Sequence, residues 1–194
     1  LTNNGATEGA STPFAASTVS ADLEADSTQH LTAPDNDSLD ITGSITIEAW
    51  VNPESLALYN EILIKGRDGL ISNSRTNYAL RLEDSGKITF YYNDGTNYHL
   101  FKTDAVQIST ATWAHVAAVY TFGTPGSAII YKDAVSVAAS WTFGAGDQPG
   151  VANVDKLVLG EIYVDATPAE SFDGMMDEIR IWNKALDSTQ IAMN

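Results

Sequence analysis

Short runs of alternating apolar and polar residues, separated by turn sequences, constrain this chain more than any other feature. Ser44–Val51 is the clearest run, because its hydrophobic residues recur at a period of two. Lys87–Tyr92 and Tyr98–Lys102 flank Asn93–Gly95, whose Asn-Asp-Gly sequence is typical of a β-hairpin turn. Only Asp187–Ala192 has the pattern of a helical turn with an N-cap residue. The chain is therefore expected to consist almost entirely of β-strands.

The number of these runs and the lack of helical crossovers exclude a parallel α/β sheet. They predict an all-β fold, a two-sheet antiparallel β-sandwich of the jelly-roll type with a short C-terminal helical turn. The whole chain, residues 1–194, is expected to form one domain. Residues 1–20 are rich in Thr, Ser, Ala, Gly and Asn, with Phe14 as their large apolar anchor. This composition predicts a linker-like or loosely attached N-terminal segment.

The charge of the chain excludes some classes of partner. Asp and Glu number 25 and Lys and Arg number 10, which gives a formal net charge of −15. Such a surface repels phosphate backbones, so nucleic acid is not an expected partner. No apolar run approaches the ~20 residues that span a bilayer, so membrane insertion is not expected. Cysteine is absent, but a domain of this size can be secreted without disulfides.

Three segments, in this order, carry a resemblance to a known family. They are Leu39–Pro53 (L-D-I-T-G-S-I-T-I-E-A-W-V-N-P), Thr112–Tyr120 (T-W-A-H-V-A-A-V-Y) and Phe172–Leu186 (F-D-G-M-M-D-E-I-R-I-W-N-K-A-L). Over residues 22–194 the chain resembles laminin-G-like, concanavalin A-like jelly-roll domains, which are related to pentraxins and legume lectins. Tyr131–Asp133 also resembles the family's Leu-Tyr-Val-Asp-Gly sequence, with Ala134 in place of its glycine. The resemblance implies a sandwich fold and an extracellular domain. The start at Leu1 and not at Met favours a fragment cut from a longer polypeptide, and the absence of cysteine fits a bacterial exported protein.

Aromatic residues are the candidates for ligand binding. The tryptophans within the family sequences, Trp50, Trp113 and Trp182, are expected to pack in the core. Other aromatic residues flank the hairpin or precede a glycine-rich loop, where an exposed ring can stack on the apolar face of a sugar. The two adjacent tyrosines of the hairpin must point to opposite faces of their strand, so one can pack inside while the other faces out. The candidate ligand-binding residues are Tyr91, Tyr92, Tyr98 and Trp141.

The closing strand, Phe172–Trp182, is expected to contain a β-bulge. The family pattern requires Met176 and Ile179 to face inward together, whereas a regular strand places them on opposite faces. A bulge near Asp177 would free backbone carbonyls beside a carboxylate. Hard oxygen ligands of this kind suit calcium.

The resemblance implies a structural calcium ion that joins the first and last strands. Leu23–Leu31 resembles the first strand of the family and places Asp26 in its acidic position. We therefore expect Ca2+ at Asp26 and Asp177. The alternative is that Asp177 pairs with Arg180 or caps a turn. A second acidic loop contains Asp165, Glu170 and Asp173, with a spacing that fits no defined calcium loop.

Sequence motifs for catalysis are missing. The chain has no Glu-x-Asp-x-x-Glu sequence, no Gly-x-Ser-x-Gly elbow and no cysteine nucleophile. Its three histidines are far apart, which argues against a zinc site. The expected function is a non-catalytic, lectin-like module of a larger secreted or cell-surface protein that binds a polysaccharide or glycan. A protein-interaction, adhesion or spacer domain without sugar binding is the alternative.

Overall fold

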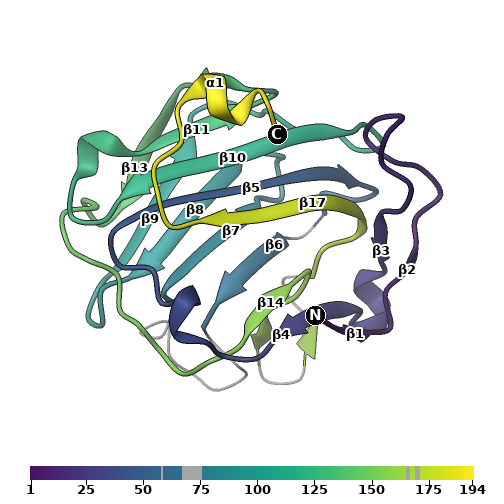
Figure 1. Ribbon diagram of the computed structural model, residues 1–194, viewed down its shortest axis with the longest axis horizontal. Helices are drawn as coiled ribbons and strands as arrows, with labels where there is room; N and C mark the ends of the chain where they lie inside the picture. The colour runs from purple at the N-terminus through teal and green to yellow at the C-terminus, as the bar shows by residue number, and fades with distance from the viewer. Residues whose placement is uncertain (58, 67–75, 165–166, 169–170) are drawn as a thin grey trace.

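Two antiparallel β-sheets pack face to face in the computed structural model, which describes residues 1–57, 59–66, 76–164, 167–168 and 171–194. An eight-stranded sheet has the order β1-β4-β14-β6-β7-β8-β9-β13, and a seven-stranded sheet has the order β12-β11-β10-β5-β17-β3-β2. Figure 1 shows β10, β5 and β17 of the second sheet crossing in front of β6, β7 and β8 of the first. The predicted all-β jelly-roll sandwich is confirmed.

The strands are short, as the spacing of the turn sequences predicts. The eight-stranded sheet consists of β1 (Thr2–Asn4), β4 (His30–Ala33), β14 (Leu157–Leu159), β6 (Asn60–Lys65), β7 (Tyr78–Leu82), β8 (Ile88–Asn93), β9 (Tyr98–Thr103) and β13 (Ala139–Phe143). The seven-stranded sheet consists of β12 (Val135–Val137), β11 (Ile129–Lys132), β10 (Ala114–Thr121), β5 (Ser44–Pro53), β17 (Gly174–Trp182), β3 (Ala21–Leu23) and β2 (Thr7–Glu8).

The remaining elements are small. They are the 3-10 turns η1 (Ala25–Ser27), η2 (Asp37–Leu39) and η4 (Pro125–Ser127), the strand pair β15 (Tyr163–Val164) and β16 (Thr167–Pro168), and the helix α1 (Ser188–Ile191). Helix α1 has a capping box between Asp187 and Gln190, as expected for the C-terminal turn. Within the described part of the chain, no helix has the length and apolar character needed to cross a membrane.

The hydrophobic core lies between the two sheets. Ile45, Ile47, Ala49 and Val51 of β5 have no exposed area, as their alternation in the sequence predicts. Each large aliphatic side chain buried in this way contributes ~1.5–3 kcal/mol to stability. The opposite face of β5 carries Trp50, whose ring contacts His115 at 5.3 Å between centroids. The tryptophan is therefore on the outer face of the seven-stranded sheet, which corrects its expected place in the core.

Trp182 lies on the same outer face, where its indole N–H donates to Glu48 at 2.8 Å. Trp113 is half-buried and donates its indole N–H to Ser11 Oγ at 3.0 Å. These rings are covered by the ends of the chain and not by the facing sheet. For Trp50 and Trp182, the alternation along the strand explains the difference, because smaller aliphatic residues occupy the core-facing positions beside them.

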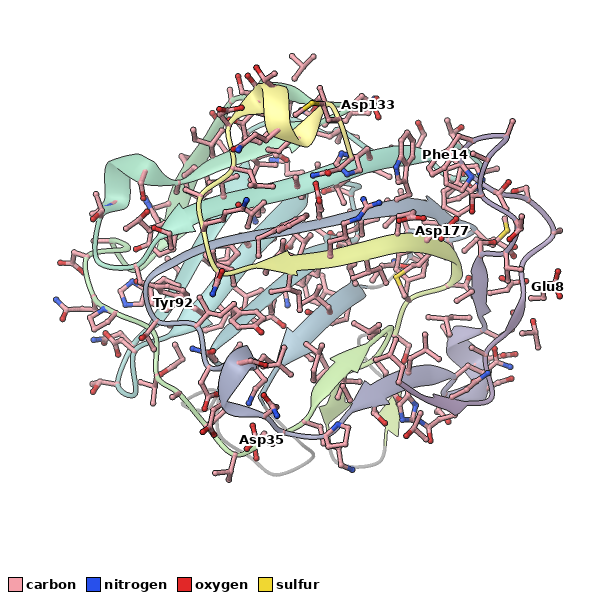
Figure 2. The ribbon with its side chains drawn as sticks, in the orientation of Figure 1. Glu8, Phe14, Asp35, Tyr92, Asp133 and Asp177 are labelled. Carbon is pink, nitrogen blue, oxygen red and sulfur yellow. The ribbon has the colours of Figure 1, made fainter. Side chains whose placement is uncertain are left out.

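The N-terminal segment, expected to be linker-like or loosely attached, is part of both sheets. Strand β1 pairs with β4 at the edge of one sheet, and β2 pairs with β3 at the edge of the other. The Phe14 ring lies 6.0 Å from the Trp50 ring, in an edge-to-face contact. Figure 2 shows Phe14 over the seven-stranded sheet. Backbone hydrogen bonds hold these short polar strands, and such bonds leave no signature in composition.

Candidate functional site

A row of polar side chains crosses the outer face of the eight-stranded sheet. Glu61 of β6 pairs with Arg81 of β7, Arg81 pairs with Thr89 of β8, and Thr89 pairs with Lys102 of β9. Directly paired residues of antiparallel strands point to the same face. Their neighbours along the strands, such as Leu80, belong to the core between the sheets. We call Glu61, Arg81, Thr89 and Lys102 the polar row.

The centre of the polar row is a fixed guanidinium group. Arg81 donates from Nε and Nη2 to Glu83 Oε1 at 3.2 and 3.1 Å. Its Cζ atom lies 4.2 Å from the centroid of the Tyr59 ring and 4.9 Å from that of the Tyr91 ring. Burial alone would lower the pKa of Arg81, but the neighbouring tyrosine hydroxyls and carboxylates outweigh it and raise that pKa. The arginine therefore stays charged and is held between two aromatic rings.

Both carboxylates beside Arg81 are engaged in hydrogen bonds. Glu83 Oε1 also accepts from Thr89 Oγ1 at 2.8 Å, and Glu61 Oε2 accepts from the Tyr91 hydroxyl at 2.9 Å. Glu61 has no exposed area, and Glu83 is 6 % exposed. Buried charges persist where they are paired and hydrogen-bonded, and such a network holds its members in one geometry. The row is therefore a rigid array of donors and acceptors.

An aromatic rim borders this network. The Tyr98 ring lies 5.3 Å from the Tyr91 ring and 6.4 Å from the Phe143 ring, measured between centroids. Phe143 ends β13, next to β9, and 66 % of its surface is exposed. Tyr98 is half-buried. We call Tyr98 and Phe143 the aromatic rim, and it offers an accessible apolar ring beside fixed polar groups.

Comparison with known proteins identifies the family of this sandwich. Residues 25–192 match the laminin-G type of the concanavalin A-like lectin/glucanases superfamily. The chain belongs to this superfamily. No curated protein matches this laminin-G-like domain.

Solved structures share the fold of this laminin-G-like domain. A candidate carbohydrate-binding protein from Bacteroides ovatus is 24% identical with a TM-score of 0.61, and the alignment covers 85% of this chain and 44% of that chain. The CBM40 of the Ruminococcus gnavus IT-sialidase, bound to α2,3-sialyllactose, is 15% identical with a TM-score of 0.62 over 80% and 85% of the two chains. A pentraxin from Limulus polyphemus is 15% identical with a TM-score of 0.52 over 83% and 78%.

The four aromatic candidates from the sequence lie on two different faces of the laminin-G-like domain. Tyr92 lies between the sheets without exposed area, stacks on His99 at 4.6 Å and donates its hydroxyl to Gln148 O at 2.6 Å. Trp141 is half-buried against the same core and donates its indole N–H to Pro125 O at 3.2 Å. The Tyr92 ring therefore has no face on which a sugar could stack, because its position on β8 is one that points inward.

Tyr91 points to the outer face but is only 1 % exposed, so it supports Arg81 and does not itself form an open platform. Tyr98 is the one candidate that lies on the accessible rim. Sequence reasoning missed Phe143 and the polar row. A signal for the row was present, because Arg81 interrupts the apolar run Tyr78–Leu82 at a position that points away from the core.

The structure does not bring the two calcium candidates, Asp26 and Asp177, together. Strand β3 pairs with β17 from Leu23 opposite Gly174 to Ala21 opposite Met176. Asp177 therefore lies just beyond one end of this pairing, and Asp26 lies three residues beyond the other. Several strand residues of ~3.3 Å each, followed by the 3-10 turn that holds Asp26, thus lie between the two carboxylates, whereas two ligands of one calcium are only ~5 Å apart.

The predicted bulge of β17 is confirmed, because the register with β5 shifts between Asp177 and Arg180. Asp177 accepts the Glu178 backbone N–H at 2.8 Å on one oxygen and the Ser17 hydroxyl on the other. Its alternative pairing with Arg180 is not formed, since Arg180 contacts Glu178. Among the residues that the structure describes, no three His, Cys, Asp or Glu side chains are placed to hold a metal ion. Asp165 and Glu170 of the second acidic loop lie outside the described residues.

Proposed function

We propose that this domain is a non-catalytic, lectin-like module of a larger secreted or cell-surface protein. Its ligand is a polysaccharide or glycan, bound on the outer face of the eight-stranded sheet. The observation that carries the proposal is the exposed Phe143 ring beside a rigid polar row. Membership of a lectin and glucanase superfamily and the likeness to carbohydrate-binding structures support it.

The chemistry of a sugar ring matches this surface. A pyranose ring has an apolar C–H face that an exposed aromatic ring can cover, and hydroxyl groups at its edge that need donors and acceptors. Phe143 and Tyr98 supply the first contact, and the half-buried Lys102 supplies a donor at the accessible end of the polar row. Glu83 and Glu61 accept hydrogen bonds from Thr89 and Tyr91, and we propose that they hold the site in place and take no part in a reaction.

A structural calcium ion stays a prediction from the family resemblance. Asp177 could take part in such a site through the bulge, and Asp26 lies beyond the other end of the pairing between β3 and β17. The proposed sugar contacts do not depend on the ion. Thermal unfolding in calcium and in EDTA checks the prediction, because an ion that binds only the folded state raises the unfolding midpoint.

A glycan array followed by titration calorimetry tests the proposed function. Phe143→Ala should weaken binding of the best array ligand by ~10-fold, because it removes the stacking ring without disturbing the core. Val135→Ala is the matched control, since Val135 is also 66 % exposed but lies on β12 of the other sheet. Absence of any glycan ligand would overturn the proposal and favour a protein-interaction domain. If Phe143→Ala and Val135→Ala weaken glycan binding equally, the glycan does not bind at the aromatic rim.

A further inference from the structure

A pocket lies at the end of the sandwich where strands β6 and β17 begin. It is formed by the 3-10 turn η1, the start of β6 and the residues that precede β17. Its volume is about 410 Å³, within the range of pockets that bind small organic molecules. We call it the acidic pocket, and the described residues that line it are Glu24, Ala25, Asp26, Ser55, Ala57, Asn60, Ser171 and Asp173.

All charged side chains that are described in the lining of the acidic pocket are negative. Glu24, Asp26 and Asp173 contribute carboxylates, and none of its described lining residues is basic. Desolvation raises the pKa of Glu24, and the negative charges of Asp22, Asp173, Glu54 and Asp26 raise it further. Carboxylates that repel one another in this way favour a cation between them.

A buried hydroxyl in the same pocket points to a ligand independently of the charge. Ser171 is 2 % exposed, and its Oγ atom is buried without a hydrogen-bond partner. Buried polar groups are nearly always hydrogen-bonded, so an unsatisfied hydroxyl in a pocket wall calls for a polar partner. The wall around it is fixed, because Asn60 Oδ1 accepts the Asp173 backbone N–H at 3.1 Å and Asp173 Oδ1 accepts the Ala25 N–H at 3.4 Å.

The geometry favours an organic cation over a metal ion. A calcium ion needs six to eight oxygens at about 2.3–2.6 Å from one point, and these carboxylates do not converge in that way. An ammonium group needs only one or two carboxylates within hydrogen-bond distance. Serine and asparagine side chains beside the carboxylates match the hydroxyl groups of a polyol.

We propose that the acidic pocket binds an amino sugar with a free, protonated amine, such as a glucosamine unit of a glycan. Its ammonium group lies among Glu24, Asp26 and Asp173, and one of its hydroxyls meets Ser171 Oγ. The pocket thus forms a second subsite of the proposed lectin, and the inference rests on the proposed function for its choice of a sugar. It separates sugars by charge, since N-acetylation removes the positive charge and leaves the ring hydroxyls in place.

Titration calorimetry with two tetrasaccharides tests the proposal. One is a tetramer of glucosamine and the other a tetramer of N-acetylglucosamine. The test variant is Glu24→Gln/Asp26→Asn, because both side chains are exposed and their loss should not prevent folding. The control variant is Asp37→Asn/Asp147→Asn, which removes two exposed carboxylates outside the pocket and changes the net charge equally. Ser171→Ala is a third variant, which leaves the charge unchanged.

The glucosamine tetramer should bind the wild type and the control alike, and the test variant at least tenfold more weakly. Ser171→Ala should weaken the same tetramer, and the N-acetylated tetramer should not respond to the loss of the two carboxylates. Equal affinity of the test and control variants for glucosamine would overturn the proposal, as would saturable calcium binding in the pocket that displaces the sugar. If the test variant binds the glucosamine tetramer as well as the control does, but Phe143→Ala still weakens glycan binding, only the amino-sugar subsite is rejected. Failure of both experiments would reject the lectin function.

Discussion

His115 lies on β10 on the outer face of the seven-stranded sheet, beneath the Trp50 ring. It is 4 % exposed, and its Nε2 atom lies 3.5 Å from Glu48 Oε2. Burial lowers the pKa of the imidazole, and the positive charge of Arg180 lowers it further. The carboxylates of Glu48 and Asp133 oppose this change but do not cancel it. The folded chain therefore holds the neutral imidazole more firmly than the unfolded chain does.

This environment sets a direction for the pH dependence of stability. Between its lowered folded pKa and its unfolded pKa of ~6.5, His115 binds more protons in the unfolded state, so stability rises with pH. The contribution of His115 is present above ~6.5 and is lost as the pH falls through the folded pKa. In His115→Gln, which cannot titrate, the free energy of unfolding should change less steeply between about pH 5 and 7. Urea denaturation at several pH values measures this, and parallel curves for the two proteins would contradict it.

Single residues also mark where sequence reasoning about the site succeeds and fails. The adjacent Tyr91 and Tyr92 could be assigned to opposite faces from strand geometry alone, and they do lie on opposite faces. Which face is open could not be derived, because exposure depends on segments that are distant in the sequence. Phe143 was missed for the same reason, since it is exposed only through its place at the end of an edge strand.

The hairpin between β11 and β12 turns at two residues with left-handed backbone. Lys132 pairs with Val135, and Asp133 and Ala134 between them have φ values of 49° and 62°. Two-residue hairpins with positive φ at both positions favour glycine. The family sequence that this hairpin resembles has glycine where Ala134 stands, so the alanine side chain is strained here.

Ala134→Gly should therefore stabilise the domain by up to ~1 kcal/mol, because the left-handed backbone costs alanine ~1–2 kcal/mol and the greater chain entropy that glycine loses offsets part of this gain. Thermal or chemical unfolding of the variant beside the wild type measures the change. Ala139→Gly is the control, since Ala139 lies within β13 without a positive φ and its replacement should destabilise. A loss of stability in Ala134→Gly would show that the alanine side chain makes contacts that outweigh the strain.

Strands with their own hydrophobic alternation were predictable as elements. Strand β5 and the hairpin of β8 and β9 follow from local patterns, because each pattern reflects which side chains face the core. The bulge in β17 was predicted from the family resemblance, which requires two residues of opposite parity to face inward. Strands β1 and β2 were not predictable in this way. Their side chains are exposed, and only pairing with distant strands makes them regular.

The whole molecule carries far more negative than positive charge. Its formal net charge of −15 makes the folded surface repel itself, and salt screens this repulsion over about 10 Å at 0.1 M ionic strength. The midpoint of thermal unfolding should therefore rise as NaCl increases from about 0.01 to 0.5 M in the presence of EDTA. Circular dichroism measures the midpoint, and KCl should give the same increase. A midpoint that falls with salt would mean that the weakening of surface ion pairs outweighs the relief of the net repulsion.

Because edge strands β1 and β2 are short, the resistance of the sandwich to a pulling force depends on where the force is applied. Each is held to its neighbour along two or three residues, at the border of its sheet. A pulling force applied at Leu1 would break the pairings between β1 and β4 one at a time, so β1 would separate from β4 at low force. A force applied to β5 would instead have to shear its long pairings with β10 and β17 at once.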